Sequence, residues 1–301
     1  MHGGRLALTG MMNMGNQTDV LIIGAGCLGA GIARDLSMRG IPCALLLEKT
    51  PSHGFISRCE DMLQSGALYA SVDPVAARKC FIEYRILARI ASHCVTEKGA
   101  RIVRMLDEDE TPFSLFQETL SQIGIPSRRL PADKTLEAEP ALAPGVAEAL
   151  EVPCMSVNPL LLSASNLRSA HELGAQLITD LHVTALIEKN REIQGVRVTR
   201  ERTGEEFEVH ARCVINAAES RTGAIVALAG IHVPLVFMKS IFLLMESRPT
   251  EMIIQRFQLG LKDQLLIVPT GASTLIKSLR EASGPEDTRV GSEDVDTIMD
   301  Q

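Results

Sequence analysis

Three glycines with the spacing G-x-G-x-x-G are the residues whose arrangement points most directly to chemistry: Gly24, Gly26 and Gly29. This spacing suits the pyrophosphate of a dinucleotide, because the first glycine allows a tight turn and the second lets the backbone approach the phosphates. The third lets a helix pack closely on a strand. The start of that helix offers N–H groups and a positive dipole end to the anion. The pattern therefore predicts a dinucleotide site.

The elements that must position these glycines are also predicted. Residues 19–24 form a short apolar run rich in branched side chains, as in a buried parallel strand. The following segment predicts a helix that ends at Gly40 and has one apolar face, made by Leu28, Ile32 and Leu36. A second buried strand, residues 43–48, ends in Glu48, whose carboxylate can accept hydrogen bonds from ribose hydroxyls. In the alternative interpretation the glycines serve packing alone and Glu48 is a solvated surface charge.

Further helices and strands are expected downstream. Helices are expected from Asp73-Pro74, over residues 112–123, and from Asn158-Pro159 to Gly174; after Gly174 the apolar residues recur with the period of two that is typical of strands. Strands are expected at residues 175–179, 183–187, 194–200, 206–210, 213–218, 241–245 and 265–268. A nicotinamide domain would continue to alternate strands with helices, whereas this chain has a three-stranded patch. That difference favours FAD over NAD.

Composition excludes several classes of function. The chain has 301 residues, which suffices for one large or two ordinary domains, and its net charge of -7 argues against nucleic acid as a partner. No apolar run reaches the roughly 18 residues of a membrane span. Residues 1–17 are expected to form a disordered leader that is not a secretion signal. Seven cysteines without a C-x-x-C pair indicate reduced thiols in a cytosolic protein and no metal site.

Residues 19–40, 65–70 and 90–95 resemble, in order, the FAD-dependent glycerol-3-phosphate dehydrogenases, in particular the catalytic A subunit of the anaerobic type. The match continues through residues 151–153, 157–159, Asn166, 216–218, 266–269 and 289–296. Enzymes of this family oxidise sn-glycerol 3-phosphate to dihydroxyacetone phosphate and pass the electrons through the flavin to a quinone. The resemblance implies an α/β fold: a Rossmann-like FAD-binding domain of the glutathione-reductase/DAO type, with a β-meander and a partial α+β substrate domain.

The resemblance also implies roles for particular residues. Those expected to bind the adenosine diphosphate half of FAD are Gly24, Ala25, Gly26, Gly29, Glu48 and Lys49. Val183 would lie beside the adenine through its backbone, and Ala217 and Ala218 near the flavin-side pyrophosphate. Ser57, Arg58 and Ser65 fall in the segment that approaches the flavin, and Lys239 would contact the substrate. No residue is assigned as a general base.

Several positions depart from the family pattern. Residues 59–61 replace an Asn-His-Gly stretch, and Leu68 replaces an arginine that would suit a phosphate. Glu219 replaces a glycine beside the pyrophosphate, where a carboxylate would repel the phosphates. Of the family's Pro-x-Lys-Gly segment only Lys239 remains. Family members continue past this length with a segment that returns to the FAD domain, so we expect the chain to be truncated.

We expect a leader at 1–17, the FAD-binding domain at 18–100 and 151–230, a cap segment at 101–150, and a truncated substrate domain at 231–301. Two functions follow from the sequence. The chain is either a quinone-linked dehydrogenase of glycerol 3-phosphate or an inactive, truncated or diverged relative with at most residual nucleotide binding; an NAD-dependent dehydrogenase is a distant third. By resemblance, a quinone or electron-transfer subunits would be its partners. The location would be cytoplasmic, or peripheral at the inner face of the cell membrane.

Overall fold

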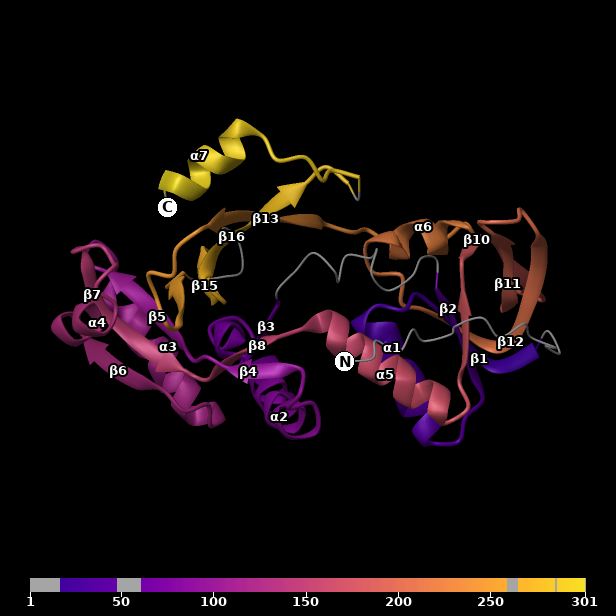
Figure 1. Cartoon of the computed structure of the whole chain (residues 1–301), viewed down its shortest axis with the longest axis horizontal. Coiled ribbons are helices and arrows are strands. Elements are labelled where there is room, and N and C mark those ends of the chain that lie inside the picture. The colour runs from indigo at the N-terminus through magenta and orange to yellow at the C-terminus, as the bar shows by residue number, and fades with distance from the viewer. Residues whose placement is uncertain (1–16, 48–60, 259–264, 285, 301) are drawn as a thin grey trace. The chain divides into compact units, whose positions relative to one another are not determined.

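A computed structural model describes residues 17–47, 61–258, 265–284 and 286–300 (Figure 1). The chain divides into two compact units. The first unit comprises Met1–Glu60 and Asn158–Leu235, and the second comprises Asp61–Val157 and Val236–Gln301. Residues 61–100, which the sequence places in the FAD-binding domain, therefore lie in the second unit.

The first unit is a six-stranded sheet with the strand order β10-β11-β12-β1-β2-β9. Its parallel part consists of β1 (Gln17–Ile23), β2 (Cys43–Leu47), β9 (Gln176–Thr179) and β12 (Glu206–Asn216). The antiparallel meander adds β10 (Leu181–Lys189) and β11 (Glu192–Arg200). The helices are α1 (Cys27–Met38), α5 (Pro159–Glu172), η4 (Glu219–Arg221) and α6 (Thr222–Ala227). β12 is one continuous strand, so the expectation of two strands over residues 206–218 is wrong.

The central strands of this sheet are apolar because both of their faces are covered. Leu21 and Ile23 of β1 point into a cluster formed with the meander strands. Ile22, between them, points to the other face, where it packs with Leu45 of β2 and with residues of α1 and α5. Alternation of side chains along a strand thus serves two cores, which explains the uninterrupted apolar run.

The second unit contains a seven-stranded and a three-stranded sheet, ordered β13-β16-β15-β14-β5-β7-β6 and β3-β8-β4. The larger sheet consists of β5 (Ala100–Met105), β6 (Arg128–Pro131), β7 (Val146–Val152), β13 (Phe237–Met245), β14 (Ile253–Arg256), β15 (Leu266–Thr270) and β16 (Ser273–Ala282). The smaller consists of β3 (Asp61–Gln64), β4 (Val95–Glu97) and β8 (Cys154–Val157). The helices are η3 (Ala67–Tyr69), α2 (Pro74–Ile90), α3 (Glu110–Ile123), α4 (Ala132–Ala138) and α7 (Ser292–Asp300).

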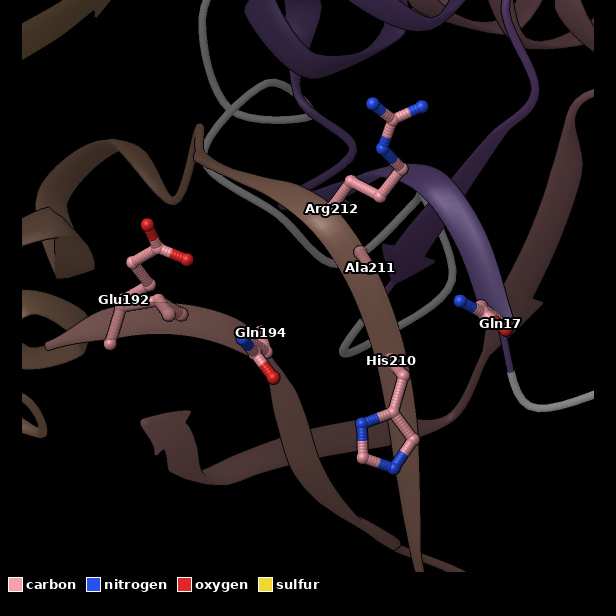
Figure 2. A pocket seen from close by; sticks show the side chains of 7 residues that line it. Gln17, Glu192, Gln194, His210, Ala211 and Arg212 are labelled. Carbon is pink, nitrogen blue, oxygen red and sulfur yellow. The ribbon is translucent and has the colours of Figure 1, made fainter. Parts of the chain in front are cut away.

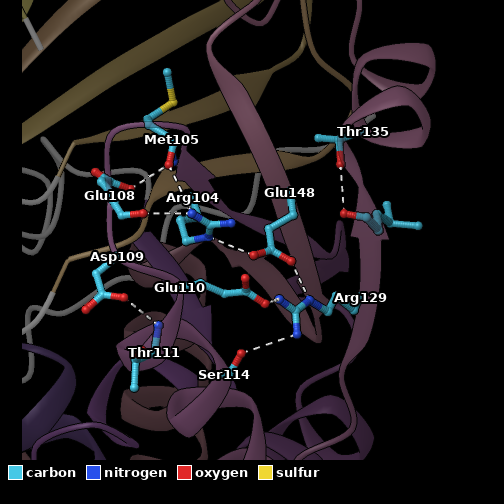
Figure 3. Close-up of polar contacts among 11 residues, drawn as sticks. Arg104, Met105, Glu108, Asp109, Glu110, Thr111, Ser114, Arg129, Thr135 and Glu148 are labelled. Atoms are coloured by element: carbon cyan, nitrogen blue, oxygen red, sulfur yellow. Dashed lines mark hydrogen bonds and ion pairs between the residues drawn. The ribbon is translucent and has the colours of Figure 1, made fainter.

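Arginines and glutamates alternate across the neighbouring strands β5, β7 and β6. Glu148 of β7 accepts a hydrogen bond from Nε of Arg104 on β5 at 2.7 Å, and another from Arg129 on β6 (Figure 3). Three residues along, Glu151 lies between Arg101, at 2.9 Å, and Arg128. Burial raises the pKa of Glu148, but the bonds from Arg129 and Arg104 outweigh it and hold the pKa below its usual value. We call these six side chains the Arg–Glu ladder.

Candidate cofactor site

The glycine turn lies where β1 meets α1, against the end of β12. Gly24 has φ +104°, and its N–H donates to the carbonyl of Leu46 at 3.1 Å. A Cβ on Gly24 would lie 2.3 Å from the carbonyl oxygen of Ala217, and one on Gly29 would lie 1.9 Å from the carbonyl oxygen of Gly24. Because these neighbours are backbone atoms, they cannot move aside as side chains do. Both positions therefore require glycine.

The helix that follows is suited to an anion. Gly26 is the N-cap of α1 and has no side chain to bond the first turn, which also contains no acidic residue. The first intrahelical bond runs from the Ala30 N–H to the Gly26 carbonyl at 2.9 Å. The amide groups of the first turn and the positive end of the helix dipole are thus available to phosphate oxygens. These features fit the pyrophosphate of FAD.

The topology places the turn where ligands of such sheets bind. β2 and β12 flank β1 on opposite sides, so the strand order reverses at β1. Ligands occupy the crevice outside the carboxyl ends of the strands at such a switch point. Ala217, 2 % exposed, extends the end of β12 there, and its N–H donates to the carbonyl of Ile23 at 2.8 Å. The structure thus brings together Gly24, Gly29 and Ala217, and their contact with FAD stays a prediction.

The backbone beyond Ala217 is unusual. The side-chain oxygen of Asn216 accepts from the Ala218 N–H at 3.1 Å, and its amide nitrogen donates to the Thr222 carbonyl at 3.0 Å. This turn leads to Glu219, whose φ of +51° lies in the left-handed region that favours glycine. A glutamate thus holds a strained conformation one residue from Ala218. The sequence marked this position by its departure from the family pattern, but not by its backbone conformation.

The remaining expected cofactor residues are only partly described. Val183 is 6 % exposed, packs in the meander core and pairs with Val198, with a β-bulge directly after it. Its backbone contact with adenine stays a prediction. Glu48, Lys49, Ser57 and Arg58 lie outside the described residues, as do Cys59 and Glu60.

Ser65 and Leu68 lie in the second unit, beside a cavity of about 10 Å³. Ser65 is 1 % exposed, and its Oγ has no hydrogen-bond partner within the described ranges. The cavity is at the lower limit for one water molecule and is also lined by Gln64, Cys154 and Gln255. Leu68 is half-buried and packs against the largely apolar core of this unit, which accounts for an apolar side chain at this position. Burial raises the pKa of the Cys154 thiol to about 12.

Lys239 on β13 is held by acidic partners. Its Nζ lies 3.4 Å from Oδ1 of Asp287 and 3.3 Å from Oδ2 of Asp294, and it donates to the Arg289 carbonyl at 3.1 Å. Asp294 also pairs with Arg280 at 3.4 Å. The Gly291 N–H, together with Lys239 and Arg280, holds the pKa of Asp294 below its usual value. A substrate phosphate at Lys239 would have to compete with two carboxylates.

A larger pocket, of about 840 Å³, lies elsewhere in the first unit (Figure 2). It is lined by Gln17, Glu192, Ile193, Gln194, His210, Ala211 and Arg212. Gln17 begins β1, whereas Gly24 follows its end, so this pocket is separate from the glycine turn. Among its lining residues, Arg212 forms an ion pair with Asp19, with 3.5 Å between a guanidinium nitrogen and a carboxylate oxygen. No sequence pattern predicted this pocket.

In the parts of the chain that the structure describes, no group of three or more His, Cys, Asp or Glu side chains is placed to hold a metal ion. Among the helices of those parts, none combines the length and apolar character needed to cross a membrane.

Comparisons with known proteins agree with the geometry of the turn. Residues 19–301 match the family described as FAD dependent oxidoreductase, DAO. The chain is 33 % identical over 297 residues to the A1 subunit of the anaerobic glycerol-3-phosphate dehydrogenase of Haloferax volcanii, covering 95 % of this chain and 50 % of the relative. It is 34 % identical over 285 residues to the A subunit of the anaerobic enzyme of Escherichia coli K12, covering 94 % and 52 %. The chain thus spans about half the length of these curated relatives.

Solved structures share the fold at low sequence identity. The FAD-bound L-α-glycerophosphate oxidase of Mycoplasma pneumoniae superposes with a TM-score of 0.76 at 15 % identity, covering 94 % of this chain and 77 % of that one. Glycine oxidase of Geobacillus kaustophilus gives 0.75 at 21 % identity, with 94 % and 76 % covered. The family resemblance, the α/β fold class and the preference for FAD over NAD are confirmed. The chain belongs to the DAO family of FAD-dependent oxidoreductases.

Proposed function

We propose that this chain binds FAD at the glycine turn and forms part of an enzyme that oxidises sn-glycerol 3-phosphate to dihydroxyacetone phosphate. The observation that carries the proposal is the turn itself, where backbone contacts at Gly24 and Gly29 leave room for glycine alone. The sequence similarity to glycerol-3-phosphate dehydrogenase subunits, over 94 % or more of the chain, supports the substrate. When bound, FAD supplies the hydride acceptor for this oxidation.

The residues of this chain would then orient the cofactor. Backbone N–H groups at Ala25, Gly26 and the start of α1 would bond the pyrophosphate, and Ala217 and Ala218 would approach it from β12. The other proposed contacts follow the family pattern: Glu48 and Lys49 at the ribose, Val183 at the adenine, and Ser57, Arg58 and Ser65 toward the flavin. Lys239 is the proposed substrate contact, in competition with Asp287 and Asp294.

The electrons would pass to a quinone, through partner subunits, at the inner face of the cell membrane. The support for partner subunits is that the relatives from Haloferax volcanii and Escherichia coli are themselves named as subunits.

A second candidate is a scaffold that binds nucleotide without turnover. Three observations favour it. Glu219, with a left-handed backbone, follows Ala218 where the family pattern has a glycine. Leu68 is a half-buried apolar residue packed against the core where the family pattern has an arginine, and Lys239 is already paired with acids. Each of these three features would weaken the binding of an anionic group.

One titration separates the two candidates. The purified chain is mixed with FAD while flavin fluorescence is followed, and glycerol 3-phosphate is then added without oxygen. Flavin that binds stoichiometrically and loses its visible absorption on adding substrate supports the dehydrogenase. Flavin that binds but keeps its absorption supports the scaffold. If the chain takes up no FAD, or if Gly24→Val takes it up equally well, the proposed cofactor site is wrong.

A further inference from the structure

Helix α2 buries one side and exposes the other. It begins after Asp73, whose carboxylate accepts from the Ala76 N–H at 2.9 Å, and it runs from Pro74 to Ile90. Ala77 joins the core of the second unit, and Tyr84 is also buried. The neighbours on this side are η3, β3 and α3.

The opposite side carries an apolar stripe between two rows of cations. At 3.6 residues per turn, Val75, Ile82 and the half-buried Ile86 fall within a narrow sector, and Val75 and Ile82 are 66 % and 50 % exposed. Basic residues flank this stripe, with Arg78, Arg85 and Arg89 on one side and Lys79 on the other. All four basic residues are exposed, and Glu83 is the single exposed carboxylate of α2. We call the stripe and its four cations the α2 face.

These cations differ from other exposed arginines of the chain. Arg39 pairs with Asp35, Arg168 with Glu172, and Arg202 with Asp180, each at 2.7–2.8 Å. Within the described ranges, by contrast, none of the four cations of the α2 face makes an ion pair. The chain as a whole carries a net charge of -7, so the α2 face concentrates unpaired positive charge on an acidic protein. Such a surface is complementary to an anionic one.

We propose that the α2 face docks on the surface of a bilayer that contains anionic phospholipids. The apolar stripe would enter the boundary between headgroups and acyl chains, as amphipathic helices do when they lie in the membrane interface. The long side chains on both sides would lay their methylene groups along this boundary and direct their charges to the lipid phosphates. A protein partner would have to offer an apolar groove with carboxylates along both sides, whereas an anionic bilayer supplies an apolar layer beneath a charged surface without any specific fit. This docking is independent of FAD binding and turnover.

The test measures vesicle binding by the full chain, which requires neither FAD nor substrate. Sedimentation is compared for vesicles of phosphatidylcholine alone and of equal parts phosphatidylcholine and phosphatidylglycerol. We expect binding to the anionic vesicles only, and weaker binding as salt is raised. The triple variant Arg78→Ala, Arg85→Ala, Arg89→Ala should lower the partition coefficient about 100-fold, at roughly tenfold or less per cation. Val75→Ser with Ile82→Ser should lower it at least about tenfold.

A matched control removes the same charge elsewhere. Arg168→Ala, Arg202→Ala and Arg212→Ala change side chains that are 72 %, 74 % and 81 % exposed on the first unit. This variant should bind as the wild type does. Equal binding of the wild type to neutral and anionic vesicles overturns the proposal, without recourse to any variant. So does an equal loss in the control, or a dimer in gel filtration that the α2 triple variant dissociates, since the face would then contact protein.

Discussion

Two glycines of helix α1 allow a strict test of the cofactor turn, because the same substitution should have opposite effects two residues apart. In Gly29→Ala the new Cβ would lie 1.9 Å from the carbonyl oxygen of Gly24. That atom belongs to the turn itself, so α1 must move away from β1. In Gly31→Ala the new Cβ would have nothing within 4 Å beyond its own helix. The pair therefore separates the close approach of helix and strand from the helix propensity of alanine.

The expected magnitudes differ in sign. Alanine gains about 1 kcal/mol over glycine in a helix interior, which is the full effect expected for Gly31→Ala. Gly29→Ala makes the same gain but adds overpacking at the upper end of the usual range, about 3 kcal/mol, since backbone cannot relax by a rotamer change. The net result is a loss of about 2 kcal/mol. The two variants should thus differ by about 3 kcal/mol in unfolding free energy.

The assay combines thermal unfolding with FAD titration. Gly29→Ala should lower the melting temperature by about 4–8 °C and weaken FAD at least about tenfold, because the first turn of α1 moves away from the pyrophosphate. Gly31→Ala should raise the melting temperature by a few degrees and leave FAD affinity unchanged. Equal stability of the two variants, or equal FAD affinity, would refute the geometry assigned to the turn.

Three other predictions concern particular side chains. Glu219→Gly should be about 1 kcal/mol more stable than Glu219→Ala, because both remove the carboxylate but only glycine relieves the left-handed strain. Both variants should strengthen FAD binding; calorimetry measures the difference in stability, and flavin fluorescence measures the affinity. Because the pKa of Glu148 is lowered in the folded protein, the stabilisation by its carboxylate is present above pH 4.5 and is lost as the pH falls through the folded pKa. Glu148→Gln should therefore lower the free energy of unfolding by about 3 kcal/mol at pH 7, and unfolding curves of this variant should depend less on pH in the acid range. The exposed thiol of Cys213 should react with iodoacetamide in the native protein, whereas the buried thiol of Cys154, with a pKa of about 12, should react only after unfolding. Mass spectrometry that finds Cys154 modified before Cys213 would contradict this order of reaction.

Local signals predicted those elements whose ends are set by neighbours in sequence. The helices after Asp73 and Asn158 begin as expected, because each cap side chain bonds an N–H three residues on, at Ala76 and Leu161. The first and second strands also agree with the pattern, because burial on both faces makes their apolar runs unmistakable. The first helix lies where it was expected, but its predicted apolar face is wrong at Leu28, which is 58 % exposed. Ile32 and Leu36 are half-buried, and the buried residues of this helix are the small ones: Gly29, Ala30, Ala33 and Ser37.

Elements whose partners are distant in sequence were missed. The strands within residues 100–157 were not predicted, because glutamates such as Glu148 interrupt the apolar alternation and are explained only by arginines on neighbouring strands. Helix α7 was also missed, because its buried side carries the charged Asp294 as well as Ile298, which breaks the apolar pattern. The charge of Asp294 is neutralised by Lys239 and Arg280, which lie on other elements. The ion pairs of Lys239 were not predicted for the same reason, because its acidic partners lie 48 and 55 residues further along the chain.

The Arg–Glu ladder has a consequence for how the second unit reaches its native pairing. Arg101 and Arg104 face Glu151 and Glu148 in a register set by the antiparallel pairing of β5 and β7. A shift of one residue would place each carboxylate opposite an apolar residue of β5, and a shift of three would leave only one of the two arginines opposite a glutamate. Because a buried charge without its partner is costly, misaligned strands are penalised strongly. The ladder therefore specifies strand alignment during folding, and its value lies as much in excluding wrong pairings as in strengthening the right one.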